Sequence, residues 1–151
     1  MKSFIMNDNV TGYTYGSPVK TGIILGETTF QEVPLKVEVK MEDGHSFIHF
    51  DLTKRDRVFG LGVNLGGINK RGRYYRSYCT DDALHHEDKT TLYGAHNFFI
   101  VEDDDVSTGY FIEFPSMITY DVGFKRIDDF DIEIYGEDFT LYVVEGNSIK
   151  D

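Results

Sequence analysis

The sequence predicts an all-β protein, either an antiparallel β-sandwich or a barrel. Several segments alternate apolar and polar residues, which is typical of strands that bury one face. Turn signals separate these segments at intervals of about 8–12 residues. Aromatic residues make up 15% of the chain, with 12 Phe and 10 Tyr, and both residue types favour strands. No segment has the apolar periodicity of a helix of three turns.

The clearest hairpin is expected between residues 35 and 52. Residues 35–41 alternate apolar side chains with Lys and Glu, and residues 46–52 place Ile48, Phe50 and Leu52 on one side. The sequence Glu-Asp-Gly at 42–44 lies between the two segments and is a turn signal. We therefore expect these strands to pair in antiparallel fashion.

The middle of the chain predicts two short strands and two loops. Residues 58–62 read Val-Phe-Gly-Leu-Gly, an apolar strand closed by glycines. Residues 63–73 contain three more glycines and predict a loop. Residues 73–78 are rich in aromatics and predict a strand, whereas residues 80–91 are polar without periodicity and predict a long loop.

The last third of the chain predicts five further strands. They lie at residues 97–101, 108–114, 118–124, 131–135 and 139–144. The acidic residues 102–105 form a turn between the first two, and Pro115 ends the second. We expect the last two strands to form a hairpin that turns at the Gly-Glu-Asp sequence of residues 136–138.

The C-terminal residues contain a possible helix start. Asn147 and Ser148 are good N-cap residues, and residues 149–151 are long enough for only part of a first turn. Two interpretations stay open: the chain is cut from a longer polypeptide, or these residues form a frayed tail.

Length and charge exclude several classes of protein. A chain of 151 residues predicts one domain. The net charge of −11 repels nucleic acids and anionic membranes, so neither is an expected partner. Cys79 is the single cysteine, so an internal disulfide cannot form. The first eight residues contain no signal-like apolar run, and we expect a cytoplasmic location.

The polar loop of residues 79–89 is the first candidate site. It contains the neighbouring carboxylates Asp81 and Asp82, which could accept charge-assisted hydrogen bonds from sugar hydroxyls. The alternative is an acidic loop that only faces solvent. The residues His85-His86-Glu87-Asp88 could be read as metal ligands, but adjacent side chains on an extended segment point to opposite faces. We therefore predict neither a metal site nor a cofactor.

Two further clusters are interpreted as structural. The glycines of residues 60–67 miss the spacing of a phosphate-binding loop, so we expect tight turns there. The basic residues of segment 70–76 are interleaved with Tyr74, Tyr75 and Tyr78, and we expect the basic residues to pair with local carboxylates. The histidines outside the loop, at 45, 49 and 96, are interpreted as ordinary strand residues. No arrangement of Ser, Cys and His indicates a nucleophile.

A family resemblance rests on four short segments in a fixed order. They are Phe-Gly-Leu-Gly at 59–62, Asn-Lys-Arg-Gly at 69–72, Cys-Thr-Asp-Asp at 79–82 and Leu-Tyr-Gly followed by an aromatic strand at 92–100. In this order and spacing they resemble the N-terminal domain of glycoside hydrolase family 31, the α-glucosidase family. Tyr78 and Cys79 depart from the Trp and Asn that many members carry there.

The resemblance implies a fold, a partner and a function. The fold would be a galactose-mutarotase-like β-sandwich that precedes a catalytic (β/α)8 barrel. The catalytic aspartates would lie in that barrel beyond residue 151, so no catalytic residue is expected in this chain. Asp81 or Asp82 would contact an oligosaccharide or α-glucoside substrate of a retaining α-glucosidase. The alternatives are an α-xylosidase of the same family, a stand-alone carbohydrate-binding module with Tyr74, Tyr75 and Tyr78 as its aromatic platform, and a structural interaction domain.

Overall fold

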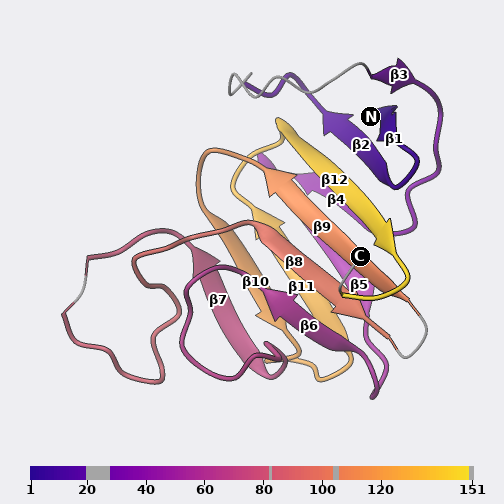
Figure 1. Ribbon diagram of the computed structural model, residues 1–151. Helices are drawn as coiled ribbons and strands as arrows, with labels where there is room; N and C mark the ends of the chain where they lie inside the picture. Colours follow the sequence, from indigo (N-terminus) through magenta and orange to yellow (C-terminus); the bar gives the residue numbers. More distant parts are fainter. Residues whose placement is uncertain (20–27, 82, 104–105, 150–151) are drawn as a thin grey trace.

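Two antiparallel sheets face each other in the computed structural model, which describes residues 1–19, 28–81, 83–103 and 106–149 (Figure 1). The described residues form twelve strands and no helix. Accordingly, none of them belongs to a helix that could cross a bilayer. The all-β prediction is confirmed, and of its two alternatives the structure is the sandwich.

The seven-stranded sheet is called sheet A. In spatial order its strands are β3 (Thr29–Phe30), β1 (Lys2–Asn7), β2 (Val10–Tyr15), β12 (Phe139–Gly146), β9 (Ser107–Glu113), β8 (Phe98–Glu102) and β6 (Arg57–Gly60). The five-stranded sheet is called sheet B. Its strands are β4 (Glu38–Glu42), β5 (His45–Asp51), β11 (Asp129–Ile134), β10 (Ile118–Val122) and β7 (Arg73–Ser77).

The core lies between the two sheets and is rich in aromatic rings. Phe99 of β8 stacks on Tyr110 at 5.2 Å between ring centroids, and Phe50 of β5 stacks on Phe130 at 5.2 Å. Phe99 and Phe130 meet edge to face at 5.1 Å across the sandwich. Such offset and edge-to-face pairs contribute stability beyond the burial of their area. The strands of both sheets therefore bury an alternating set of large side chains, as the sequence predicts.

The hairpin predicted between residues 35 and 52 is confirmed as β4 and β5. Glu42 pairs with His45, so Asp43 and Gly44 form a two-residue loop. Both have positive φ angles, of 52° and 81°. Hairpin turns of this kind need that conformation because its twist matches that of the strands.

The hairpin predicted for the last two strands is wrong. β11 pairs with β5 and β10 in sheet B, whereas β12 inserts between β2 and β9 in sheet A. The connection therefore crosses from one sheet to the other. Gly136 lies in this connection against the Phe114 ring, to which a Cβ at that position would come within 2.7 Å. The Ser46 hydroxyl donates a hydrogen bond to the Gly136 carbonyl oxygen at 2.8 Å.

Three N-terminal strands were not predicted from the sequence. β1 and β2 are partly covered on both faces, so their residues lack the clean alternation that marks a strand with one wet face. At the other end of the chain, β12 extends to Gly146 and residues 147–149 are not helical. The predicted cap residues Asn147 and Ser148 therefore begin no helix in the described segment, and residues 150–151 lie outside it.

Candidate functional site

Two long loops lie beside each other at one end of the sandwich. The β6–β7 loop comprises residues 61–72, and the β7–β8 loop comprises residues 78–97. The latter extends past the edge strand β7, on the left of Figure 1. The long loop predicted from residues 80–91 is thus confirmed, and it is longer at both ends than predicted.

The β6–β7 loop begins with an unusual backbone turn. Gly60, Leu61 and Gly62 have φ angles of 102°, 64° and 75° in succession. Leu61 is strained in this conformation, which residues other than Gly, Asn and Asp rarely adopt. Its side chain is buried, and its amide donates to the Phe98 carbonyl oxygen at 2.9 Å. The core therefore holds the turn in place, in agreement with the structural role predicted for these glycines.

Hydrogen bonds close the base of the β7–β8 loop. The Arg76 amide donates to the Thr90 carbonyl oxygen at 2.7 Å, and the Thr80 amide donates to the Leu92 carbonyl oxygen at 3.0 Å. Cys79 takes part through its side chain, since the Ala95 amide donates to its Sγ at 3.3 Å. The base of the loop is thus fixed to the sheet, and residues 81 and 83–89 lie in an arc beyond it.

The two loops are also bonded to each other. The Val63 amide donates to the Gly94 carbonyl oxygen at 2.9 Å. Gly62 allows this approach, because a Cβ at that position would lie 2.6 Å from the same oxygen. The arrangement gives the projecting arc a rigid support on both sides.

The arc carries the sequence-predicted carboxylate Asp81. Its side chain is exposed, as are those of Ala83, Leu84 and the segment 85–88. Asp82 lies outside the described residues. A carboxylate carried by a loop with an anchored base can accept hydrogen bonds from the hydroxyls of a bound molecule.

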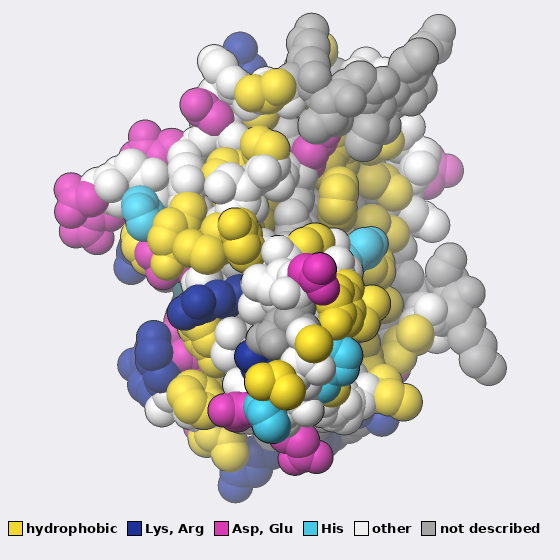
Figure 2. Space-filling model, turned by 90° about the vertical axis from the view of Figure 1, so that its left-hand side faces the viewer, with side chains coloured by type: hydrophobic (Ala, Val, Ile, Leu, Met, Phe, Trp, Pro, Cys, Tyr) yellow, Lys and Arg dark blue, Asp and Glu magenta, His cyan; other side chains and the backbone are white. Residues whose placement is uncertain are grey.

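The two site loops also carry exposed apolar side chains. They are Val63 and Ile68 of the β6–β7 loop and Tyr78, Leu84 and Tyr93 of the β7–β8 loop. Figure 2 views the molecule from this end and shows hydrophobic side chains beside histidines and acidic groups. Gathered apolar exposure of this kind is typical of a surface that contacts another molecule or domain.

Among the described residues of the arc, no group of histidine and acidic side chains lies close enough to share a metal ion. His85 contacts Tyr93, with 3.1 Å between its Nε2 and the phenolic oxygen. Within the part of the chain that the structure describes, the side chains close enough to share an ion are His49, Asp51 and Asp129, whose ligand atoms lie within 4.8 Å of one another. They belong to sheet B, far from the arc in sequence.

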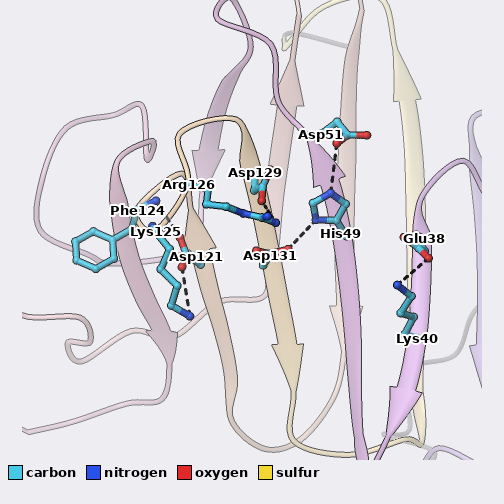
Figure 3. Close-up of polar contacts among 10 residues, drawn as sticks. All are labelled: Glu38, Lys40, His49, Asp51, Asp121, Phe124, Lys125, Arg126, Asp129 and Asp131. Atoms are coloured by element: carbon cyan, nitrogen blue, oxygen red, sulfur yellow. Dashed lines mark hydrogen bonds and ion pairs between the residues drawn. The ribbon is translucent and has the colours of Figure 1, made fainter.

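These three residues form part of a charged network on the outer face of sheet B (Figure 3). His49 Nδ1 lies 2.7 Å from Asp131 Oδ1, and its Nε2 lies 3.4 Å from Asp51 Oδ1. The hydrogen bond to Asp131 raises the pKa of the His49 imidazole above its usual value, and that to Asp51 acts in the same direction against the opposing effect of burial. Metal binding needs the neutral imidazole, so this environment favours an ion pair instead. His49 is therefore more than the ordinary strand residue that the sequence indicated.

A shallow cavity of about 270 Å³ lies beside this network. Asp121, whose side chain is largely buried, and Lys125 line it together with Phe47 and Tyr74. Asp121 Oδ1 accepts hydrogen bonds from the amides of Phe124 and Lys125, at 2.9 and 3.1 Å. Asp121 thus fixes the turn after β10, and its position is explained by structure alone.

Substituting His49 should produce a pH-dependent loss of stability. Because the folded-state pKa of His49 is raised, its contribution is fully present below the unfolded-state pKa of about 6.5. That contribution is lost as the pH rises through the folded-state pKa. His49→Gln should therefore lower the free energy of unfolding more at pH 5.5 than at pH 8.5, as measured by urea titration. In the background of Asp131→Asn the difference between the two pH values should largely disappear, and a difference that persists there would contradict the assignment.

The basic and aromatic cluster of residues 70–78 is buried only in part. Tyr75 is only 1% exposed, so Tyr74, Tyr75 and Tyr78 cannot form the one aromatic platform that the alternative of a stand-alone carbohydrate-binding module requires. Lys70 is buried with its Nζ 5.7 Å from the Tyr75 ring centroid, and burial lowers the pKa of its amine.

Arg71 binds backbone oxygens where the sequence predicted carboxylates. Its guanidinium donates to the carbonyl oxygens of Thr53, of Asp56 at 2.9 Å and of Ile127 at 2.7 Å. It therefore joins its own loop to the segment 53–56 and to Ile127. Arg71 thus stabilises the fold, because one planar guanidinium can donate hydrogen bonds to several acceptors at once.

Comparisons with known proteins agree with this fold. Residues 13–121 match the family described as glycosyl hydrolase 31 N-terminal galactose mutarotase-like domain. An α-glucosidase of Saccharolobus solfataricus is 25% identical over 144 residues, covering 85% of this chain and 21% of the relative.

Two solved structures have a similar fold. A dextranase of glycoside hydrolase family 31 from Flavobacterium johnsoniae superimposes with a TM-score of 0.70 at 14% identity, covering 97% of this chain and 24% of that one. A cycloalternan-degrading enzyme from Trueperella pyogenes gives 0.61 at 15% identity, covering 93% and 23%. The chain thus spans between a fifth and a quarter of these relatives. It belongs to the family of N-terminal galactose mutarotase-like domains of glycosyl hydrolase 31.

Proposed function

We propose that this chain acts as the N-terminal accessory domain of a retaining α-glucosidase, which releases terminal α-linked glucose from carbohydrates. In this proposal the domain supports a catalytic barrel and contributes a loop aspartate to the substrate pocket. The catalytic aspartates belong to that barrel, beyond residue 151. The choice of α-glucosidase rests on the curated relative, whose match covers 85% of this chain.

One structural observation supports the role of the loop. The base of the β7–β8 loop is closed by backbone hydrogen bonds, and the arc above it presents the exposed Asp81. Functional residues are often carried by loops that a rigid scaffold positions. An anchored base limits the entropy that the loop loses when it binds a partner surface or a sugar.

In this proposal the loop binds the sugar ring and takes part in no covalent step. Asp81 or Asp82 would accept hydrogen bonds from two neighbouring hydroxyls of a sugar ring, and so orient the ring against the barrel. Charged acceptors make shorter and stronger hydrogen bonds than neutral ones. The covalent chemistry of a retaining glycosidase requires two carboxylates about 5–5.5 Å apart, and the proposal assigns both to the barrel.

Substitution of the loop aspartates tests the proposal. In the longer polypeptide that joins this domain to its barrel, Asp81→Ala or Asp82→Ala should lower kcat/KM for an α-glucoside by about ten-fold or more, the value of one charge-assisted hydrogen bond. The sequence leaves both aspartates as candidates, so both variants are needed. The measurement is steady-state hydrolysis of an aryl α-glucoside and of maltose.

Asp88→Ala is the matched control, since Asp88 is an exposed acidic residue of the same arc. This variant should keep the kcat/KM of the unmodified enzyme. If neither Asp81→Ala nor Asp82→Ala differs from that control, the loop aspartate is not part of the pocket. If the unmodified polypeptide hydrolyses no α-glucoside, the α-glucosidase assignment itself fails.

A further inference from the structure

The two sheets have very different outer faces. On sheet B, outward side chains in one register row across the five strands are Glu38, His49, Asp131, Asp121 and Tyr74. Such a polar row is typical of a sheet face that contacts water. The outer face of sheet A has no comparable row at its centre among the described residues.

Two adjacent rows across the outer face of sheet A are apolar. Following the register from β3 to β8, the first row consists of Phe30, Phe4, Gly12, Tyr142, Phe111 and Phe98. From β2 to β6, the second row consists of Val10, Val144, Gly109, Ile100 and Phe59. We call these two rows the aromatic face.

The rings of the first row touch one another along the sheet. Phe4 lies 6.5 Å from Phe30 and 6.1 Å from Tyr142, and Tyr142 stacks on Phe111 at 5.9 Å. Gly12 accommodates the Phe4 ring, because a Cβ there would lie 2.2 Å from its Cζ. The aromatic face is therefore a continuous packed surface.

Polar residues border the aromatic face on both sides. The Tyr142 hydroxyl donates to Glu113 Oε2 at 2.8 Å on one side, and Arg57 pairs with Glu102 at 2.8 Å on the other. An apolar centre within a polar rim is the anatomy of a protein interface. Phe30 is 76% exposed in this chain, although it continues a row whose other rings are mostly covered.

We propose that the aromatic face is the docking surface for the hydrolase portion of the longer polypeptide. The inference rests on the proposed function, because it takes the barrel of the same polypeptide as the occupant. The chain spans only 21–24% of its relatives, so most of such a polypeptide is available to cover it. A covalently linked domain has a high effective concentration, which favours it over a second copy of this chain.

Chemical labelling in the longer polypeptide tests the proposal. Phe30→Cys and Phe111→Cys report on the aromatic face, and Phe47→Cys is the control on the outer face of sheet B, where Phe47 is 37% exposed. Each cysteine is labelled with a maleimide and quantified by mass spectrometry of its own peptide, in the native and the urea-unfolded protein. Covered sites should react at least about ten-fold more slowly in the native protein relative to the unfolded one, whereas Phe47→Cys should be slowed much less.

The outcomes separate this inference from the proposed function. If Phe30→Cys reacts as fast as Phe47→Cys, the aromatic face is open and the docking proposal is wrong. If its protection disappears on dilution, a second copy is the occupant, which also overturns it. Phe30 is already exposed in the domain, so Phe30→Cys should fold even where Phe111→Cys does not. Hydrolysis of α-glucosides is measured on the same samples, so protection without hydrolysis would refute the proposed function and leave the docking surface standing.

Discussion

Replacing Phe99 with alanine should lower the free energy of unfolding by about 3–5 kcal/mol. Phe99 has no exposed surface and contacts rings from both sheets, including Phe50 at 5.8 Å, Tyr120 at 6.0 Å and Phe130 at 5.1 Å. Alanine would leave a cavity that these large neighbours cannot easily fill. Equilibrium unfolding in urea, followed by far-UV circular dichroism, measures the loss.

The matched control for this prediction is Phe124→Ala. Phe124 lies after β10 and is 63% exposed, so its loss should change the free energy of unfolding by no more than about 0.5 kcal/mol. A loss below about 1 kcal/mol for Phe99→Ala would mean that this ring is not enclosed between the sheets.

Gly62→Ala should destabilise the junction of the two site loops by about 2–5 kcal/mol, from backbone strain and steric overlap together. The φ angle of Gly62 is 75°, and a Cβ there would lie 2.6 Å from the Gly94 carbonyl oxygen. Because the opposing atom belongs to the backbone, the overlap can be relieved only by separating the loops. Urea unfolding measures the loss of stability, and hydrogen exchange of the Val63 amide measures the loosening of the junction.

Gly72→Ala isolates the backbone-strain part of this effect, and the difference between the two variants gives the steric part. Gly72 has a similar φ of 80°, but a Cβ there would meet nothing within 4 Å. This variant should show the backbone strain alone, about 1–2 kcal/mol. If Gly62→Ala and Gly72→Ala lowered the free energy of unfolding equally, the close approach of the two loops at Gly62 would not require a residue without a Cβ.

Local sequence patterns predicted most strands, since alternation reflects burial of one face. The pairing of β4 with β5 was predictable because the turn, Asp43-Gly44, dictates the register, although β4 begins only at Glu38. The crossing from β11 to β12 was not, because a short connection with a glycine suits a hairpin and a change of sheet equally well. The choice between them depends on distant strands: β12 has β2 and β9 as its partners.

The candidate site was predictable only in part. The polar composition of residues 80–91 indicated a loop and drew attention to Asp81. The hydrogen bonds at its base, such as that from Ala95 to Cys79, join residues that no local pattern connects. His49 was missed for the same reason, because its partner Asp131 is adjacent only through the pairing of β5 with β11.

The position of β12 constrains the order of folding. β2 and β9 flank this strand, although they are far apart in the chain and β12 is synthesised after both. During synthesis on a ribosome, the N-terminal β1–β2 pair cannot join the rest of sheet A until the residues of β12 have emerged, because β12 lies between β2 and β9. Pairings between such distant segments close slowly, so the nascent chain exposes the edges of β2 and β9 until the final strand fills the gap between them.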